Sequence, residues 1–232
     1  MLIDPTAPFA GLLTGTPIDS NAVMTNFPTS IPGALTRTTL TNDDRGGRDV
    51  LYPAPATVIC PPIRRTHCRD AGRSSLVVKT QPANPAKASL TWKWSKGTQA
   101  ITVAELGNPL LTRTQGLCVY TGTPTRLLAL RVPPSAAKWK ARKNGGFGYS
   151  DAARAADGVK TLQLKTGEAG KPVASLKAGG MTMPVPALGA LATPITVQLV
   201  DQESALCLQS VFSATDLRHN DADKLQAKYA AP

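Results

Sequence analysis

The segment 88–96 reads ASLTWKWSK and alternates between apolar and polar residues. Leu90, Trp92 and Trp94 share one phase of this alternation, and Lys93 lies in the other. A period of two residues is that of a β-strand with one buried face. We therefore predict a strand that packs Trp92 and Trp94 into a core and ends at Gly97.

Short apolar runs of the same kind recur along the second part of the chain, at 75–79, 116–120, 127–132, 159–164, 173–176, 195–200 and 206–212. Turn-forming residues separate them and leave no room for long helices. This spacing predicts an all-β fold, an antiparallel β-sandwich of about 8–10 short strands. Segments 193–200 and 205–213 form its clearest hairpin. Residues 220–229 combine an Asn or Asp cap with good helix formers, so we expect one or two turns of helix there.

Composition supports this fold class. Aromatic residues make up only 5% of the 232 residues, whereas the chain holds 20 Pro and 19 Gly, which disfavours a helical bundle or a coiled coil. No apolar run reaches the roughly 18 residues of a transmembrane helix. The first nine residues, MLIDPTAPF, have no basic region and no apolar core, so we predict no signal peptide in this chain.

Charge and proline content divide the chain into an N-terminal part and a longer, basic second part. Residues 1–50 hold three basic and five acidic side chains, whereas 51–232 hold 23 basic and 10 acidic ones, for a net charge of +11 overall. Nine of the 20 prolines occur by Pro62, and proline opposes regular structure. We predict a poorly ordered extension or linker over 1–70, with one short strand at 49–52, and a β-sandwich domain over 71–230.

Few residues suit catalysis. The chain has two histidines, His67 and His219, and lacks a nucleophile elbow, a phosphate loop, a zinc-protease motif and an EF-hand loop. We therefore expect no enzyme activity, no catalytic residues and no cofactor. Residues 220–223 read NDAD but lack the glycine and distal glutamate of a calcium loop, so a helix cap explains them better.

The four cysteines allow three complete pairings. Cys118 and Cys207 lie inside strand runs and are positioned to join two strands, while Cys60 and Cys68 are close enough in sequence to close a small loop. The alternative for the first pair is two buried free thiols. A zinc site with Cys60, His67 and Cys68 would lack the usual ligand spacing, so we predict no metal. Disulfides would indicate an oxidising compartment.

Residues 138–143 form the densest basic cluster of the chain, and Trp139 lies within it. An exposed indole ring beside cations suits a polysaccharide or an anionic polymer, so the candidate binding residues are Trp139, Lys138, Lys140, Arg142 and Lys143. The alternative is a solvated edge strand whose lysines prevent aggregation. No motif indicates specific nucleic-acid binding.

A series of short segments between Cys68 and Tyr229 occurs in a fixed order: 74–79 with 90–97, LCVY at 117–120, WKARK at 139–143 with GFGYSD at 146–151, DG at 157–158 with LQLK at 162–165, and MTMP at 181–184. In these segments the chain resembles a family of uncharacterised β-rich domains. These domains occur at the C-terminal ends of large exported proteins in environmental, especially delta-proteobacterial, genomes. Thr121 stands where the family has an acidic residue, and Lys138 where it often has cysteine. The resemblance implies fold and export, not chemistry.

Together these observations predict a non-catalytic β-sandwich module of a longer exported bacterial protein, located outside the cell or at its surface. Its expected roles are structural spacing, adhesion or surface presentation. The alternative is a carbohydrate-binding or anionic-polymer-binding accessory module of a secreted enzyme. The expected partners are a polysaccharide or an anionic surface polymer.

Overall fold

The computed structural model describes residues 59–81, 83–123, 125–143 and 145–231. Within these ranges the chain forms twelve strands and three short helical turns, which are joined by loops. These residues belong to a single folded unit that begins at Ile59. The all-β prediction is therefore confirmed. The expected strand at 49–52 and most of the expected N-terminal extension lie outside the described residues.

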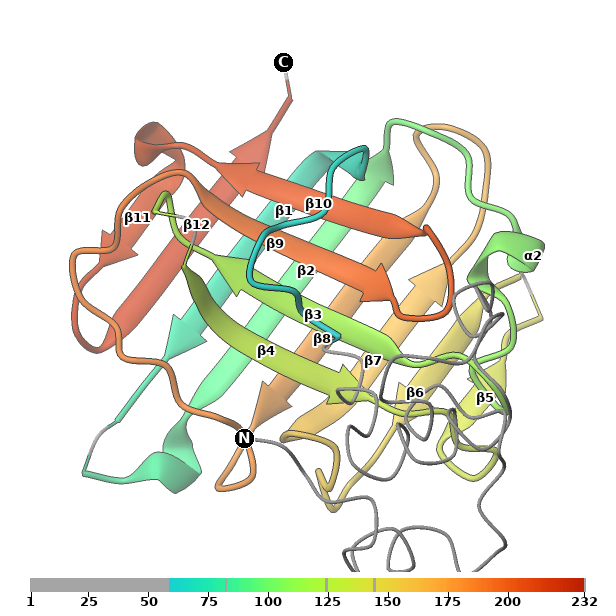
Figure 1. Ribbon diagram of the computed structural model, residues 1–232, viewed down its shortest axis with the longest axis horizontal. Helices are drawn as coiled ribbons and strands as arrows, with labels where there is room; N and C mark the ends of the chain where they lie inside the picture. The colour runs from blue at the N-terminus through green and yellow to red at the C-terminus, as the bar shows by residue number, and fades with distance from the viewer. Residues whose placement is uncertain (1–58, 82, 124, 144, 232) are drawn as a thin grey trace, which may run out of the picture. The chain divides into compact units, whose positions relative to one another are not determined.

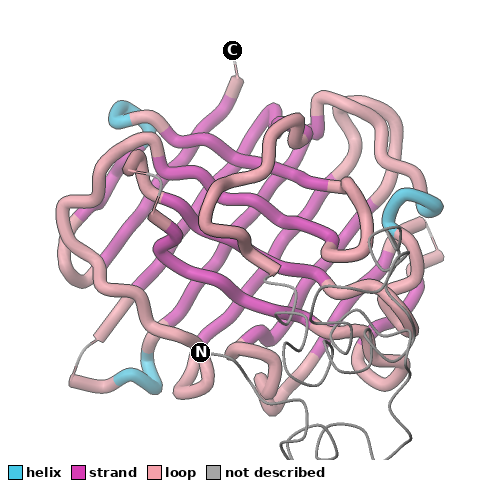
Figure 2. The backbone as a smooth tube through the Cα atoms, in the orientation of Figure 1, coloured by secondary structure: helices cyan, strands magenta, loops and turns pink. Residues whose placement is uncertain are grey.

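The strands form two layers that cross each other (Figures 1 and 2). The larger, eight-stranded layer has the order β11 (Leu217–Asn220), β12 (Lys224–Ala230), β1 (Arg69–Lys79), β2 (Ser89–Gly97), β8 (Val173–Gly179), β7 (Val159–Lys165), β6 (Phe147–Ser150) and β5 (Trp139–Ala141). The smaller, four-stranded layer has the order β4 (Arg126–Val132), β3 (Gln115–Tyr120), β9 (Ile195–Asp201) and β10 (Cys207–Phe212).

Strand β1 joins the two layers into one curled sheet. Its first residues, Arg69 and Asp70, pair in parallel with Leu208 and Gln209 of β10, and its remainder pairs with β2 and β12. This parallel contact is the exception in an otherwise antiparallel sandwich. Connections outside the strands include η4 (Pro85–Lys87), α2 (Val103–Leu106) and η5 (Ala214–Asp216).

The tryptophans of β2 fill the space between the layers, as predicted. Trp92 and Trp94 are fully buried. Their indole N–H groups donate to the facing strand β10, Trp92 to Ser210 Oγ at 3.1 Å and Trp94 to the Gln209 carbonyl at 3.0 Å. Because both polar atoms are paired, the large rings are buried without a desolvation penalty at nitrogen.

The C-terminal segment corrects one prediction. Residues 220–229 do not form a helix: β11 and β12 make a hairpin, and β12 also pairs with β1. Leu225 and Ala227 are buried while Lys228 is exposed, so the segment follows a period of two. Pairing along β1 and burial of this alternate face outweigh the intrinsic helix preference of the residues.

A strap, residues 59–68, covers the outer face of the four-stranded layer (Figure 1). Gln198 of β9 pairs with Arg65 in both directions, at 2.9 Å and 2.8 Å, and the Tyr120 hydroxyl donates to the Pro61 carbonyl at 3.0 Å. A Cβ atom at Gly116 would lie 2.1 Å from Ile59 Cγ1, so only glycine allows this approach. The strap therefore belongs to the fold, although we had placed it in the extension.

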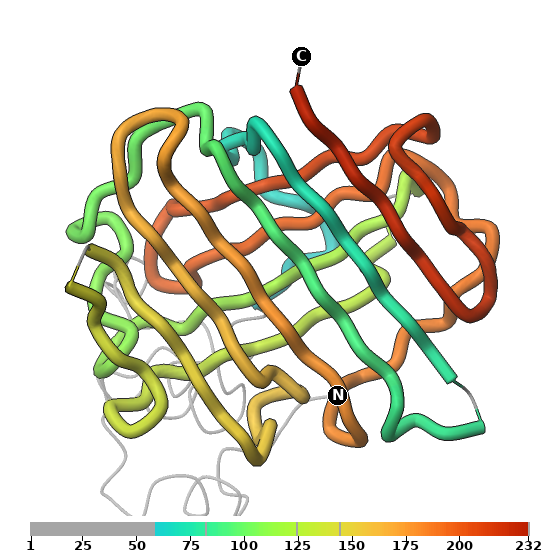
Figure 3. The backbone as a smooth tube through the Cα atoms, turned by 180° about the vertical axis from the view of Figure 1, so that it is seen from behind, coloured from blue at the N-terminus to red at the C-terminus, as the bar shows by residue number. Residues whose placement is uncertain are grey.

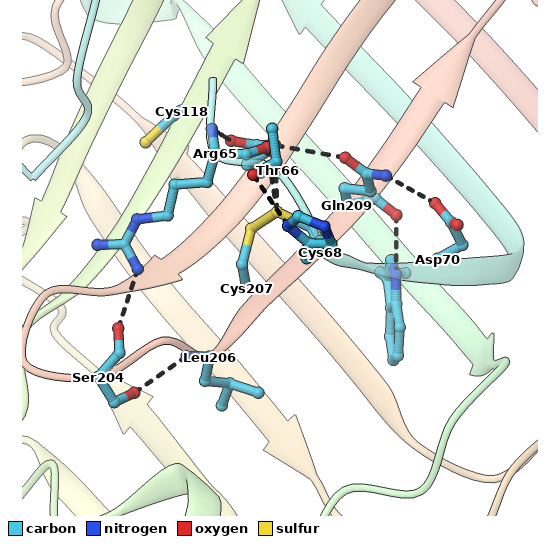
Figure 4. The surroundings of a disulfide bond; sticks show 12 residues. Arg65, Thr66, Cys68, Asp70, Cys118, Ser204, Leu206, Cys207 and Gln209 are labelled. Carbon is cyan, nitrogen blue, oxygen red and sulfur yellow. Dashed lines mark hydrogen bonds between the residues drawn. A yellow bond between two sulfur atoms is a disulfide. The ribbon is translucent and has the colours of Figure 1, made fainter. Parts of the chain in front are cut away.

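All four cysteines form disulfides, but in a pairing that differs from the expected one. Cys60 bonds to Cys118 of β3. Cys68 bonds to Cys207 of β10, as Figure 4 shows. The predicted Cys118–Cys207 bridge within the layer is therefore wrong, and so are the small Cys60–Cys68 loop and the free thiols. Both bridges instead fasten the strap to the four-stranded layer, and they indicate an oxidising compartment.

Removing the bridge nearer the N-terminus should loosen the strap. Cys60→Ala with Cys118→Ala opens a loop of 58 residues in sequence separation, and the chain-entropy account gives a loss of about 4 kcal/mol in the free energy of unfolding. Urea denaturation followed by tryptophan fluorescence measures this loss. A non-reducing peptide map of the unaltered protein that recovered a Cys60–Cys68 peptide would contradict the pairing.

Candidate functional site

In the described part of the chain, the outward positions along the strands of the eight-stranded layer carry several basic side chains. The exposed acidic residue of these strands, Asp70, lies at the start of β1, where it accepts a hydrogen bond from Gln209 of β10. Figure 3 shows the molecule from the side of the eight-stranded layer. We call this surface the cationic face and define it by Arg73, Lys79, Lys93, Lys140, Lys165, Lys177, Lys224 and Lys228. It arises because the same alternation that buries Trp92 and Trp94 turns the intervening residues outward.

Strand register spaces these cations regularly. Lys93 of β2 lies opposite Ser75 of β1 and Ser175 of β8, and Ser75 lies opposite Lys228 of β12. Lys93 and Lys228 are thus two strands apart, or about 10 Å. Lys177 lies one diagonal step from Lys93, and its cross-strand neighbours are Thr91 and Thr161. Over the centre of the face, cations and small hydroxyl side chains therefore alternate.

The charged groups of this face are free to bind a ligand. Within the described ranges, none of the eight side chains takes part in an ion pair or a side-chain hydrogen bond. The acidic residues that do form such contacts lie elsewhere: Glu105 in the short helix α2, Asp151 directly after β6, and Asp201 at the end of β9. The face therefore presents uncompensated positive charge to solvent.

The predicted cluster at 138–143 contributes to this face only in part. Lys140 points outward on the edge strand β5, opposite Gly148 of β6. The Arg142 guanidinium lies over Gly148, where a Cβ atom would be 2.8 Å from it, and Lys143 is exposed in the following turn. The sequence cluster identified the rim of the cationic face, whereas sheet pairing brings in the more distant cations.

Trp139 is not an exposed ring. It is 1% exposed, its ring centroid lies 5.3 Å from that of Tyr149, and its N–H donates to the Pro133 carbonyl at 3.1 Å. It lies opposite Tyr149 with both side chains turned inward, so the period of two places it in the core. The prediction of a sugar-stacking indole at this position is therefore wrong.

This burial leads to a test with conservative and severe substitutions. Trp139→Ala should lower the free energy of unfolding by about 3–5 kcal/mol, because it empties a core site. Trp139→Phe should lower the free energy of unfolding by less. The folded Trp139→Phe variant should bind a polysaccharide or an anionic polymer as the unaltered protein does. A folded Trp139→Phe protein that no longer bound a ligand of the unaltered protein would contradict the buried position.

Lys138 is held by a buried carboxylate. Its Nζ lies 2.8 Å from Asp151 Oδ2, which also accepts from the Tyr149 hydroxyl at 3.2 Å and the Ala155 N–H at 3.0 Å. The Lys138 ammonium holds the pKa of Asp151 below its ordinary value, although burial acts in the opposite direction. Burial and the Asp151 carboxylate raise the pKa of Tyr149 to about 12. Lys138 therefore stabilises the β5–β6 edge and is unavailable as a ligand-binding cation.

The free energy of unfolding should depend on pH, because the pKa of Asp151 is lowered in the folded protein. The ionised form stabilises the fold above the unfolded pKa of about 4, and this contribution is lost as the pH falls through the lower folded pKa. Lys138→Met should cost about 1 kcal/mol at pH 7, a modest value because the lysine side chain is 35% exposed. Urea denaturation should show the stability difference between Lys138→Met and the unaltered protein narrowing as the pH falls below about 4. A difference that stayed constant with pH would contradict the ion pair.

A second buried carboxylate has a structural explanation. Asp201, at the end of β9, accepts from the Glu203 N–H at 2.9 Å and from Gln115 at 3.2 Å, and Arg113 lies 3.5 Å away. Burial raises the pKa of Asp201. Since its oxygens are occupied by neighbouring groups, this residue links the β9–β10 loop to β3.

The remaining candidates from the sequence do not assemble into a site. Cys60 and Cys68 are in disulfides, so the zinc alternative is excluded, and no metal-binding cluster occurs among the residues that the structure describes. Asp221 accepts from the N–H groups of Asp223 and Lys224 at 3.1 Å and 2.8 Å. It therefore stabilises the turn of the β11–β12 hairpin, in place of the expected helix cap.

Comparisons with protein-family models, with curated proteins and with solved structures found no match to this chain. The resemblance to C-terminal domains of exported proteins thus stays a prediction from the sequence. In the described part of the chain, no helix is long and apolar enough to cross a membrane.

Proposed function

We propose that this domain is a non-catalytic extracellular module that adheres to an anionic polysaccharide through the cationic face. It would serve as the C-terminal part of a longer surface or secreted protein. The two disulfides support an oxidising location. The observation that carries the proposal is the set of eight cations along the strands of one sheet face, none of which forms an ion pair within the described residues.

Such a surface favours polymers over small ligands. A linear polyanion that spans several strands contacts many cations at once and releases the counterions that it had condensed. The hydroxyls of Ser75, Ser175 and Thr91 lie between the lysines and are suited to hydrogen bonding with sugar hydroxyl or acidic groups. Each contact is weak, and their number provides the affinity.

Among the described residues, no aromatic side chain lies at the outward strand positions of this face, which favours a polysaccharide over single-stranded nucleic acid. Single-stranded nucleic acid is usually bound by rings on which the bases stack, and Trp92, Trp94 and Trp139 are all buried. Stacking on uncharged sugars would need exposed rings as well. A carboxylated or sulfated polysaccharide requires only the cations and hydroxyls that the face provides.

The proposal predicts a specific loss of binding. Dextran sulfate and polygalacturonate should bind, whereas uncharged dextran should not, in an interferometry assay with immobilised protein. Lys93→Ser with Lys177→Ser removes two central charges and should weaken binding about tenfold, with a shallower dependence on salt. The matched control, Arg131→Ser with Lys171→Ser, removes two charges from β4 and from the β7–β8 loop and should have little effect.

Three results would count against the proposal. Equal losses in the two variants would show attraction by net charge alone. A purely structural spacer would bind none of the polymers. Tighter binding of a single-stranded oligonucleotide than of either polysaccharide, at equal salt, would assign the face to nucleic acid.

A further inference from the structure

One end of the cationic face contains a hollow of about 600 Å³ in which lysines come together. It lies between the β1–β2 connection, which includes η4, and the turn of the β11–β12 hairpin. Lys79, Lys87 and Lys224 line it, together with Gln81, Asn84 and Asp223. Its volume is within the range of small-ligand sites.

The lysine arrangement here differs from the rest of the face. Lys79 of β1 and Lys224 of β12 lie directly opposite each other, whereas Lys93 and Lys177 have only neutral cross-strand neighbours. Like charges in direct cross-strand pairs are unfavourable. Lys87 adds a third ammonium group from η4, so this end concentrates charge that the sheet elsewhere keeps apart.

The walls of the hollow are held in place without a ligand. The Thr80 N–H donates to the Asp223 carbonyl at 2.9 Å, and the Thr80 hydroxyl donates to the Ala222 carbonyl at 3.0 Å. These bonds fasten the end of β1 to the hairpin turn. The backbone on either side of the hollow is therefore fixed without a ligand, which lowers the part of the entropic cost of association that comes from ordering the chain.

The charge balance selects the ligand class. Three ammonium groups face one carboxylate, that of Asp223, which leaves two positive charges in excess. A phosphomonoester carries close to two negative charges at pH 7, whereas a sulfate ester or a uronate carries one. The side-chain amides of Gln81 and Asn84 make no hydrogen bond within the described chain and are available to sugar hydroxyls. We infer that the hollow binds the phosphate group of a phosphorylated sugar, and thus selects phosphorylated chains among the anionic polysaccharides of the proposed function, on which this inference rests.

A titration with small probes tests the hollow separately from the face. In ¹⁵N-correlated NMR spectra at constant ionic strength, inorganic phosphate and a hexose phosphate should shift the amide signals of Thr80, Asn84 and Asp223 saturably. A hexose sulfate, whose ester group carries a single negative charge, should bind at least threefold more weakly than the hexose phosphate. Binding of the hexose phosphate should strengthen between pH 5 and pH 7, because its second ionisation has a pKa near 6.

Two variants complete the experiment. Lys79→Gln with Lys87→Gln and Lys224→Gln should abolish the saturable shifts without lowering the melting temperature, since it relieves a like-charge contact. Lys93→Ser with Lys177→Ser should leave the phosphate affinity unchanged. Equal affinity for the hexose sulfate and the hexose phosphate, or an equal loss in both variants, would overturn the inference. Phosphate binding without polymer binding would support a phosphate site in the hollow and contradict the proposed function. Polymer binding without phosphate binding would support the proposed function and contradict the phosphate site.

Discussion

The contact between the indole rings of β2 and strand β10 holds the two layers together. Trp92 and Trp94 extend from the eight-stranded layer, and each reaches a hydrogen-bond acceptor on the four-stranded layer, Ser210 Oγ or the Gln209 carbonyl. An indole needs both a large apolar cavity and one polar partner. This double requirement fixes the register of the layers as well as their separation, because a shift of one residue on β10 would leave a buried N–H without its acceptor.

The same alternation gives the molecule its chemical asymmetry. On β2 every inward position is apolar, so the outward ones are free to carry Lys93 and its hydroxyl-bearing neighbours. The outer face of the four-stranded layer differs, because β3 and β9 are buried on both faces. There the strap and its two disulfides cover the sheet, and Ile59, Tyr120 and Val200 form a second apolar cluster. One outer face is thus covered by the chain itself, and the other is left open with its charge.

Sequence reasoning succeeded where side-chain period and burial agree. The β2 strand, the β9–β10 hairpin and the buried positions of Trp92 and Trp94 all follow from a period of two residues. Trp139 is buried opposite Tyr149, with half-buried Lys138 and exposed Lys140 on either side of it in the sequence, but these charges suggested an exposed ring. The same alternation was present at Leu225 and Ala227, where helix-forming composition favoured the wrong structure. In both cases local composition was given more weight than alternation.

The disulfide pairing and the cationic face depend on contacts between residues that are distant in sequence. Local sequence patterns do not contain this information. The pairing of Cys60 with Cys118 spans 58 residues and that of Cys68 with Cys207 spans 139, and neither follows from strand periodicity. One clue was available: the runs at 117–120 and 195–200 have few polar positions, which is typical of strands covered on both faces. Such strands need a covering segment, and a cysteine within one of them is positioned to bond to that segment. The cationic face has the same origin. Its lysines are spread over six strands and are brought together only by the sheet order, so the cluster at 138–143 revealed one edge of a surface that pairing completes.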